Sequence, residues 1–453
     1  MAQEYIVKNG NEALTSHSGL ALVGALLNNR TNLEERLNGI VLPDLASPTI
    51  AHSDIVFSMT GLISLGKPDY DAIEPFRGDD FFQTSLDLGT VPSSPTVRQR
   101  LDLVNGHFDT IIKEESASLI RNTARVISPV STEKGPLLPV DIDVSPFDNS
   151  RTQKEGVSRT YKGHDGYAPI FAYLGREGYL VNTELREGKQ HCQKGTPDFL
   201  HETIKYAREI TTDPMLLRLD SGNDSAENVK ISIDESVDFI IKRNLRKESL
   251  EDWLEVAKKY GKAHIARPGK TVYQGSVYRK LRDIDEPVRI VFDIAERTID
   301  KKGQALLIPE IEVDTYWASL KDSERQVIEL YHDHGTSEQY HSELKTDMDI
   351  ERFPSKNFKT NSLILLMGML SYNMLRLCGQ ESLHSINANQ RPAFRKDAFR
   401  RRIRTVMQDL IYLAGRITSH SRKLYISFGR YCHWANIWQN IYKRFLDPIQ
   451  PAV

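Results

Sequence analysis

Strand-like and helix-like segments alternate along the middle of the chain, and this alternation limits the folds open to it. Residues 140–144 alternate apolar and acidic, the two-residue period of a half-buried strand, with Asp141 and Asp143 on one face. Four further runs also read as strands: "YAPIFAYLG", "GYLVNTEL", "MLLRLD" and "VDFIIKRN". Residues 196–210 and 248–261 lie among them and read as helices. Strands that alternate with helices predict an α/β core.

Residues 263–317 break that rhythm, because three strand-like runs follow one another with turns such as "DKKG" between them. We expect an all-β insertion inside the α/β core, with helical regions at both ends of the chain. The expected divisions are 1–130 (helical, probable DNA-binding), 131–262 (first part of the core), 263–317 (β-rich insertion), 318–380 (second part of the core) and 381–453 (basic, helical).

Length and composition exclude several classes of protein. At 453 residues with 40% hydrophobic and 26% charged residues, the chain is expected to form about three globular units. Three cysteines do not make a disulfide framework, and no signal peptide or membrane-spanning segment of about 20 residues is evident. We expect a soluble protein of a reducing cytoplasm, without a membrane partner.

The formal net charge of −2 hides an uneven distribution. Between Arg391 and Asp447, thirteen basic residues face three aspartates, so this tail carries a charge of +10. A basic region of this kind is typical of a protein that binds a polyanion, although it is as often a solvated helix surface. The N-terminal helices, including "SSPTVRQRLDLV", are a second candidate for a DNA-binding unit.

Three acidic residues lie where a rigid element begins or ends. Asp143 is near the end of a predicted strand, Asp220 ends another, and Glu338 opens a predicted helix with Thr336 or Ser337 as its cap. Carboxylates held stiffly at a common edge suit a pair of Mg²⁺ ions, which need several oxygen ligands. Each residue alone would more often be a turn former or a helix-dipole partner.

A second pattern surrounds Glu338. Glu338, His341 and Lys345 are spaced by three and four residues, so they share one face of a helix, and Tyr331 and His334 precede them. A carboxylate one turn from an imidazole and two turns from an ammonium suits an anionic substrate held against cations.

This segment resembles the signature of the bacterial insertion-sequence DDE transposases, in which Tyr, Arg, Glu and Lys have this spacing. His334 stands where that family has Arg. The likeness extends over most of the chain in the same order. It includes "VDIDVS", whose spacing to Ser145 selects Asp143 rather than Asp141, and also "LLRLDSGND", "GKPDYDAIEPFRGDDFF" and "FKTNSLILLMGMLSYNML".

The resemblance implies an RNase H-like catalytic core in which Asp143, Asp220 and Glu338 bind two Mg²⁺ ions, with Mn²⁺ as a substitute. It implies a cut-and-paste enzyme that cuts the ends of an insertion sequence and joins them to target DNA. Tyr331, His334 and Lys345 are then expected to contact DNA, together with His341 on the same face. In some relatives a Trp stacks on a flipped base, and Trp317 stands where it could do so, although a core position is commoner.

The partners implied are double-stranded DNA, as terminal inverted repeats and target, and a second copy of the chain on DNA. The implied location is the bacterial cytoplasm, at the nucleoid. An inactive or domesticated DNA-binding relative remains an alternative, as does a nuclease that cuts without joining. Two Glu-x-x-His pairs, Glu338–His341 and Glu381–His384, allow a di-iron protein, and His332 to His334 allow a zinc cluster; both are weak.

Overall fold

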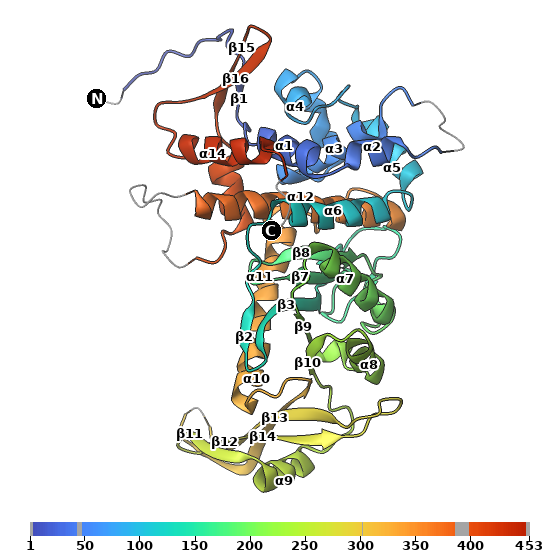
Figure 1. Ribbon diagram of the computed structural model, residues 1–453, viewed down its shortest axis with the longest axis vertical. Helices are drawn as coiled ribbons and strands as arrows, with labels where there is room; N and C mark the ends of the chain where they lie inside the picture. Colours follow the sequence, from blue (N-terminus) through green and yellow to red (C-terminus); the bar gives the residue numbers. More distant parts are fainter. Residues whose placement is uncertain (1–2, 43–47, 301, 386–397, 450–453) are drawn as a thin grey trace.

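The computed structural model describes residues 3–42, 48–300, 302–385 and 398–449. Along the long axis of the molecule, a layer of helices is followed by a central sheet and then by a β-rich end (Figure 1). Both ends of the chain belong to the helical layer, and a long run of helix, the rod (residues 324–347), passes along the sheet below it.

The N-terminal region is helical, as predicted. Its α-helices are α1 (Leu20–Arg30), α2 (Leu33–Asn38), α3 (His52–Ser64), α4 (Asp80–Ser85), α5 (Ser94–Val104) and α6 (Asp109–Thr123). The helix α3 is buried along its whole length, and α1 along most of its length. Helices covered on all sides form the centre of a bundle rather than a face that reads DNA.

The bundle surrounds α12 (Phe358–His384), which contacts α1, α3, α5 and α6 on one side and the strand β8 (Tyr179–Glu184) on the other. Among the described helices α12 alone is long and apolar enough to cross a membrane, and 94% of its apolar window is buried inside the protein. The Asn373 side chain accepts a hydrogen bond from Leu180 N at 2.9 Å and donates one to Leu180 O at 2.7 Å. The helix therefore fastens the bundle to the sheet.

The central sheet is mixed. Its strands β3 (Gly135–Val144), β9 (Met215–Leu219) and β10 (Asp238–Lys242) are parallel, and β7 (Ile170–Leu174) and β8 add to it antiparallel. The short strand β2 (Val130–Thr132) pairs with β3. The helices α7 (Thr196–Ile210) and α8 (Ala226–Asp234) complete the crossovers. The predicted α/β core is thus confirmed as a mixed α/β fold.

The predicted β-rich segment is composed of strands but does not form a sheet of its own. The strands β11 (Lys262–Arg267), β12 (Lys270–Arg279), β13 (Val288–Ile299) and β14 (Ala305–Ala318) follow in order, and β14 pairs with β10. One sheet of ten strands results. The helix α9 (Leu250–Tyr260) packs on β12, β13 and β14, so the extension is not all-β. Long strands can extend past β10 because β14 shares only its last residues with it.

The C-terminal region is not helical throughout, contrary to the prediction. The elements α13 (Ile403–Val406) and a π-helical turn (Met407–Ile411) lead into a hairpin of β15 (Gly415–His420) and β16 (Lys423–Phe428), followed by α14 (Ala435–Leu446). The strand β1 (Leu14–Thr15) pairs with β15, which joins the two ends of the chain. The apolar periods of two and 3.6 residues are hard to separate in segments of six residues.

The remaining strands are short. A small sheet is formed by β4 (Phe147–Asp148), β5 (Ser158–Arg159) and β6 (Asp165–Tyr167), beside the end of β3. The rod consists of α10 (Glu324–His332), a 3-10 turn (Asp333–Thr336), α11 (Ser337–Ser342) and a π-helical turn (Glu343–Asp347). Glu338 therefore lies inside a continuous helical run. The helix α11 has Glu338 in its first turn, as predicted, but Thr336 has helical φ and ψ and forms no side-chain cap, so the predicted cap is wrong.

Candidate active site

Asp143 and Asp220 lie side by side at the carboxyl ends of two parallel strands. The register pairs Ile142 with Leu219, so the next residue of each strand is one of the two aspartates. Burial raises the pKa of Asp143 to about 6, and the negative charge of Asp220 contributes to that rise. Burial also raises the pKa of Asp220, while Asn223 Nδ2 donates a hydrogen bond to Asp220 Oδ1 at 2.6 Å. Two like charges are thus held together in a poorly solvated place.

The rod runs alongside β3, and its residues His334 and His341 contact that strand. His334 Nδ1 lies 3.2 Å from Asp141 Oδ1, and His341 Nδ1 lies 3.7 Å from Asp143 Oδ2. Farther along, Lys345 Nζ donates a hydrogen bond to Pro146 O at 2.6 Å. His341 and Lys345, two of the three residues predicted to share a face, thus both contact the end of β3 or the residues that follow it.

Glu338 lies on this same face, between His334 and His341. Its side chain is exposed and forms no hydrogen bond or ion pair with any described residue. Burial raises the pKa of Tyr161, and the charges of Asp143, Asp220 and Glu338 raise it further. The Tyr161 hydroxyl, which donates to Val144 O at 3.1 Å, therefore experiences the field of all three carboxylates. All three predicted acidic residues thus contribute to the electrostatic field at Tyr161, and Glu338 is the exposed one among them.

Asp141, the other acid of β3, has a different partner. Arg218 of β9 binds it through two hydrogen bonds, Nε to Oδ1 at 2.6 Å and Nη2 to Oδ2 at 2.8 Å, and both side chains are 3% exposed. Arg218 Nη1 also donates to Leu330 O at 2.6 Å, at the end of α10. Burial opposes the ionisation of Asp141, but Arg218 and His334 hold its pKa below the ordinary value. This ion pair fastens both aspartate-bearing strands to the rod.

Sequence reasoning missed Arg218, Tyr161 and Asn223. A signal existed for Arg218, because an arginine inside the otherwise apolar strand "MLLRLD" requires a buried partner on a neighbouring strand. Tyr161 belongs to a loop between β5 and β6 whose path depends on tertiary packing, so its position beside the carboxylates had no sequence signal.

Of two predicted DNA contacts, Trp317 is buried and Tyr331 is half-buried. Trp317 is 4% exposed, and its Nε1 donates to Asp224 Oδ1 at 2.8 Å, so it occupies the core position that the sequence also allowed. Tyr331 packs against Tyr316 at 4.7 Å and His334 at 5.8 Å between ring centroids. Neither ring is presented for stacking on a base in this structure.

Burial lowers the pKa values of two basic side chains of the rod, His341 and Lys345. Burial lowers the pKa of His341 well below its ordinary value, and the neighbouring Lys345 adds to this, so the imidazole is neutral at pH 7. The Nε2 atom of His341 is buried without a hydrogen-bond partner among the described residues. Burial lowers the pKa of Lys345 to about 8, against the attraction of Glu351. Lys345 thus remains a cation near neutral pH.

The far end of the rod is fixed by buried ion pairs. Glu343 is 1% exposed and accepts from Arg376 of α12 and, at 2.8 Å, from Arg400 Nη1. Asp347 pairs with Arg402 at 2.8 Å and with Arg404 at 3.3 Å. These contacts hold the rod, and with it Glu338, against the helical layer.

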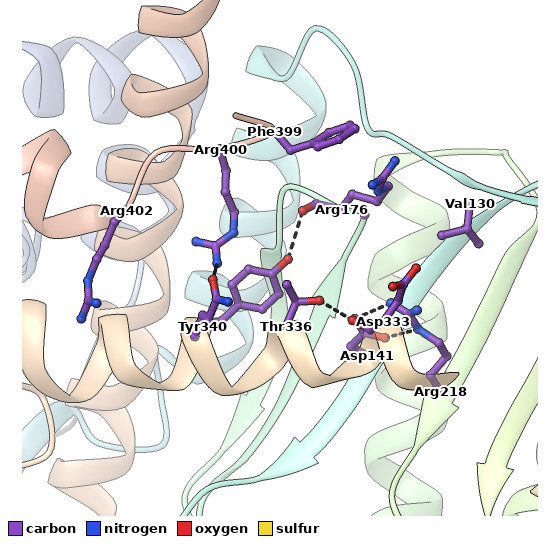
Figure 2. A pocket seen from close by; sticks show the side chains of 12 residues that line it. Val130, Asp141, Arg176, Arg218, Asp333, Thr336, Tyr340, Phe399, Arg400 and Arg402 are labelled. Carbon is purple, nitrogen blue, oxygen red and sulfur yellow. Dashed lines mark hydrogen bonds and ion pairs between the residues drawn. The ribbon is translucent and has the colours of Figure 1, made fainter. Parts of the chain in front are cut away.

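A cavity of about 340 Å³ lies on the opposite flank of the rod (Figure 2). Figure 2 shows Asp333, Thr336 and Tyr340 of the rod facing Arg176 and Phe399, with the Asp141–Arg218 pair at one end. Asp143, Asp220 and Glu338 do not line this cavity. The carboxylate edge is therefore separate from this cavity.

Among the described residues, no three His, Cys, Asp or Glu side chains are close enough to enclose a metal ion. This disfavours the zinc cluster at His332 to His334. The di-iron alternative is wrong, because Glu381 is bound by Arg125 and by Arg444, each at 2.9 Å. The pair Asp143 and Asp220 does suit Mg²⁺, which is usually held by one or two carboxylates together with waters and substrate phosphates.

Comparison with known proteins identifies the family. Residues 4–449 match the model of the family described as "Transposase DDE domain group 1". A solved structure, titled "Cryo-EM structure of piggyBac transposase synaptic complex with hairpin DNA (SNHP)", is similar at 11% identity and a TM-score of 0.42. That match covers 98% of this chain and 85% of the other. No curated protein matches the chain. Because the family match spans nearly the whole sequence, this chain belongs to the DDE transposases of group 1.

Proposed function

We propose that this transposase cuts the ends of a mobile DNA element and joins them to target DNA, using Asp143, Asp220 and Glu338 in an RNase H-like core. The observation that supports the proposal is the adjacency of Asp143 and Asp220 on parallel strands, with His341 of the Glu338-bearing rod 3.7 Å from Asp143 Oδ2. Because all three expected acidic residues are present in the sequence, the alternative of a catalytically inactive DNA-binding relative is not favoured.

The carboxylates would hold two divalent ions, Mg²⁺ or Mn²⁺, with Glu338 completing the set from the rim. The repulsion that raises the pKa of Asp143 is the kind that a bound dication relieves. When bound, such ions supply activation of a water or 3′-hydroxyl and charge stabilisation on the leaving oxygen. Asn223 orients Asp220 through its hydrogen bond, and the Asp141–Arg218 pair keeps the two strands in register.

Cations beside the carboxylates would hold the DNA backbone. Lys345 is partly exposed and positively charged at neutral pH, so it suits a phosphate. His334 is 6% exposed and close to Asp141, so its role would be to position β3 rather than to contact DNA. The guanidinium that the family places at His334 has a counterpart here in Arg218, which comes from β9.

The substrates would be duplex DNA with terminal inverted repeats and a target duplex, and two copies of the chain would act on paired ends. A bacterial insertion sequence, acting at the nucleoid in the cytoplasm, is the proposed origin. Both strand hydrolysis and strand transfer are compatible with one site, because only the attacking hydroxyl differs.

The test is DNA cleavage with Mg²⁺ or with EDTA, followed by separation of the product strands. Glu338→Ala and Asp143→Ala are expected to abolish cleavage while leaving DNA binding intact. Asp333→Ala is the matched control, since Asp333 is an exposed acid of the same rod on the opposite flank. Mg²⁺ should also raise the melting temperature of the wild type but not of Asp143→Ala.

The proposal fails if Glu338→Ala cuts DNA at the wild-type rate, or if EDTA leaves cleavage unchanged. Loss of activity in Asp333→Ala to the same extent would show that any charge change on the rod inactivates the protein. A wild type that binds element ends but never cuts them would support the inactive alternative.

A further inference from the structure

The hairpin β15–β16, which we call the wing (residues 415–428), carries unpaired positive charge. Arg416, Arg422 and Lys423 are exposed and form no ion pair with any described residue. No Asp or Glu occurs between Asp409 and Asp447, so no acid of this segment offsets them. The wing projects from the helical layer beside α14 (Figure 1). Its charge is therefore available to a polyanion.

Much of the remaining basic tail is not available in this way. Arg400, Arg402 and Arg404 bind the buried acids of the rod, and Arg444 binds Glu381. Arg391, Arg395 and Lys396 lie outside the described residues. Arg430 and Lys443 are also exposed, on segments that adjoin the wing. The structure thus separates basic residues that hold the fold together from those that face solvent at the wing.

The tip of the wing keeps an arginine where the backbone favours glycine. The two-residue turn joins β15 to β16, and its residues Ser421 and Arg422 have φ values of 51° and 60°. Turns with two positive φ angles match the twist of a hairpin, but they are normally built from Asn, Asp or Gly. Arg422 is strained in this conformation, and strained residues are usually kept where the side chain has a function. A positive charge at the tip of the wing would be such a function.

A groove of about 490 Å³ lies between the wing, α14 and α4, which is within the usual range for a site that takes a small ring system. Its lining includes Tyr425 of the wing and Trp438 and Tyr442 of α14, the last two stacked at 5.2 Å between ring centroids. Trp438 is 4% exposed, and its Nε1 has no hydrogen-bond partner among the described residues. The amide side chains of Asn436 and Gln439 also line the groove.

The helix α5, which the sequence suggested as part of a DNA-binding unit, exposes less positive charge than the wing. In α5 the guanidinium of Arg100 is 8% exposed and donates to Ile50 O at 3.0 Å and to His52 Nδ1 at 2.8 Å. Only Arg98 of that helix is an exposed cation. The helix therefore presents one charge to solvent where the wing presents three.

We propose that the wing and its groove form a DNA-binding site, an inference that rests on the proposed function as a transposase. Arg416, Arg422 and Lys423 bind backbone phosphates. The aromatic groove takes an unpaired nucleobase, because a base can stack on the exposed ring of Tyr425 and the exposed amides of Asn436 and Gln439 can pair with its polar edge. The DNA recognised is thus a duplex with a frayed or single-stranded end.

The test is DNA binding measured by fluorescence anisotropy in EDTA, where cleavage plays no part. Two probes are used: a blunt duplex and the same duplex with an unpaired overhang. Replacing Arg416, Arg422 and Lys423 together with Ala should reduce the slope of log K against log salt by about 0.9 for each lost phosphate contact. Arg422→Gly should weaken binding while leaving the melting temperature equal or higher, because glycine relieves the strained turn.

The groove is tested with Tyr425→Ala, which removes an exposed ring, and with Gln439→Ala, which removes an exposed amide of the lining. The wild type should prefer the overhang, and each variant should lose about tenfold of that preference while binding the blunt duplex normally. The double replacement Lys280→Ala and Arg282→Ala, in the turn between β12 and β13, removes two charges from another exposed hairpin as a control.

An unchanged salt slope in the wing variant, or an equal loss in the control, would overturn the phosphate contacts. A wild type without preference for the overhang, or variants that keep it, would overturn the nucleobase site. Asp333→Ala, outside both the wing and the carboxylate edge, should bind both probes as the wild type does. Because binding is measured in EDTA, the binding results can be interpreted even if the catalytic proposal fails.

Discussion

Two groups of acidic residues on and beside the rod differ in whether positively charged side chains neutralise them. At its far end, Glu343 and Asp347 are buried but surrounded by guanidinium groups from Arg376, Arg400, Arg402 and Arg404. Beside its middle, Asp143 and Asp220 are partly buried next to each other, and Glu338 forms no hydrogen bond or ion pair with any described residue. One group is neutralised by the protein, and the other is not.

The contrast indicates which group serves the fold and which serves chemistry. Removing one partner of a buried ion pair strongly destabilises the fold, because the other charge is left buried and unpaired. Adjacent buried carboxylates without a cation lower stability, and proteins keep such arrangements at functional sites. Removing a charge should therefore have opposite effects on stability in the two groups.

The largest effect is expected at the neutralised group. Arg376→Leu leaves Glu343 buried without its partner from α12, and it also removes the donor to Arg401 O at 2.7 Å. The free energy of unfolding should fall by about 3–5 kcal/mol, measured as a loss of melting temperature. The triple variant Glu343→Gln, Arg376→Met and Arg400→Met should recover part of this loss, since neither the acid nor its two guanidinium partners then remain as unpaired charges.

An intermediate effect of opposite sign is expected at the carboxylate pair. Because the pKa of Asp143 is raised in the folded protein to about 6, its ionised form opposes folding above that pH. Asp143→Asn should raise the free energy of unfolding by about 1–3 kcal/mol at pH 7 to 8 and abolish cleavage. The gain should shrink as the pH falls below about 6 and vanish near pH 4, where the carboxyl is protonated in both states.

Thermal melting across that pH range, in EDTA, measures the difference between Asp143→Asn and the wild type. A variant that is less stable than the wild type at pH 8 would show that Asp143 contributes a favourable contact to the fold. The distinction between the two acidic groups would then be lost.

The smallest effect is expected at an exposed pair on the same rod. Arg325 Nε lies 2.8 Å from Glu329 Oε1, with side chains 79% and 61% exposed. Arg325→Ala should change the free energy of unfolding by less than about 0.5 kcal/mol and leave cleavage unaltered, because solvent screens such pairs. A shift as large as that of Arg376→Leu would mean that any charge on the rod matters and burial does not.

The local parts of the fold were predictable where periodicity was strong. Residue spacing predicted the strand through Asp143, the helices at 196–210 and 250–260, and a common face for Glu338, His341 and Lys345. The register that places Asp143 beside Asp220 did not follow, because parallel strands are joined through long crossovers that leave no local trace of pairing. The hairpin of the wing was missed because short basic and aromatic segments fit a helix equally well.

The sequence by itself determined the α/β class, the acidic residues at element ends and the membership of a transposase family, since these depend on residue type and spacing along the chain. Only the tertiary structure decided which arginines are used up inside the protein and which remain on its surface. It also joined the β-rich segment to the central sheet and paired Asp141 with Arg218. These outcomes depend on contacts between distant segments, and the strength of a charge depends on burial and neighbours that composition does not contain.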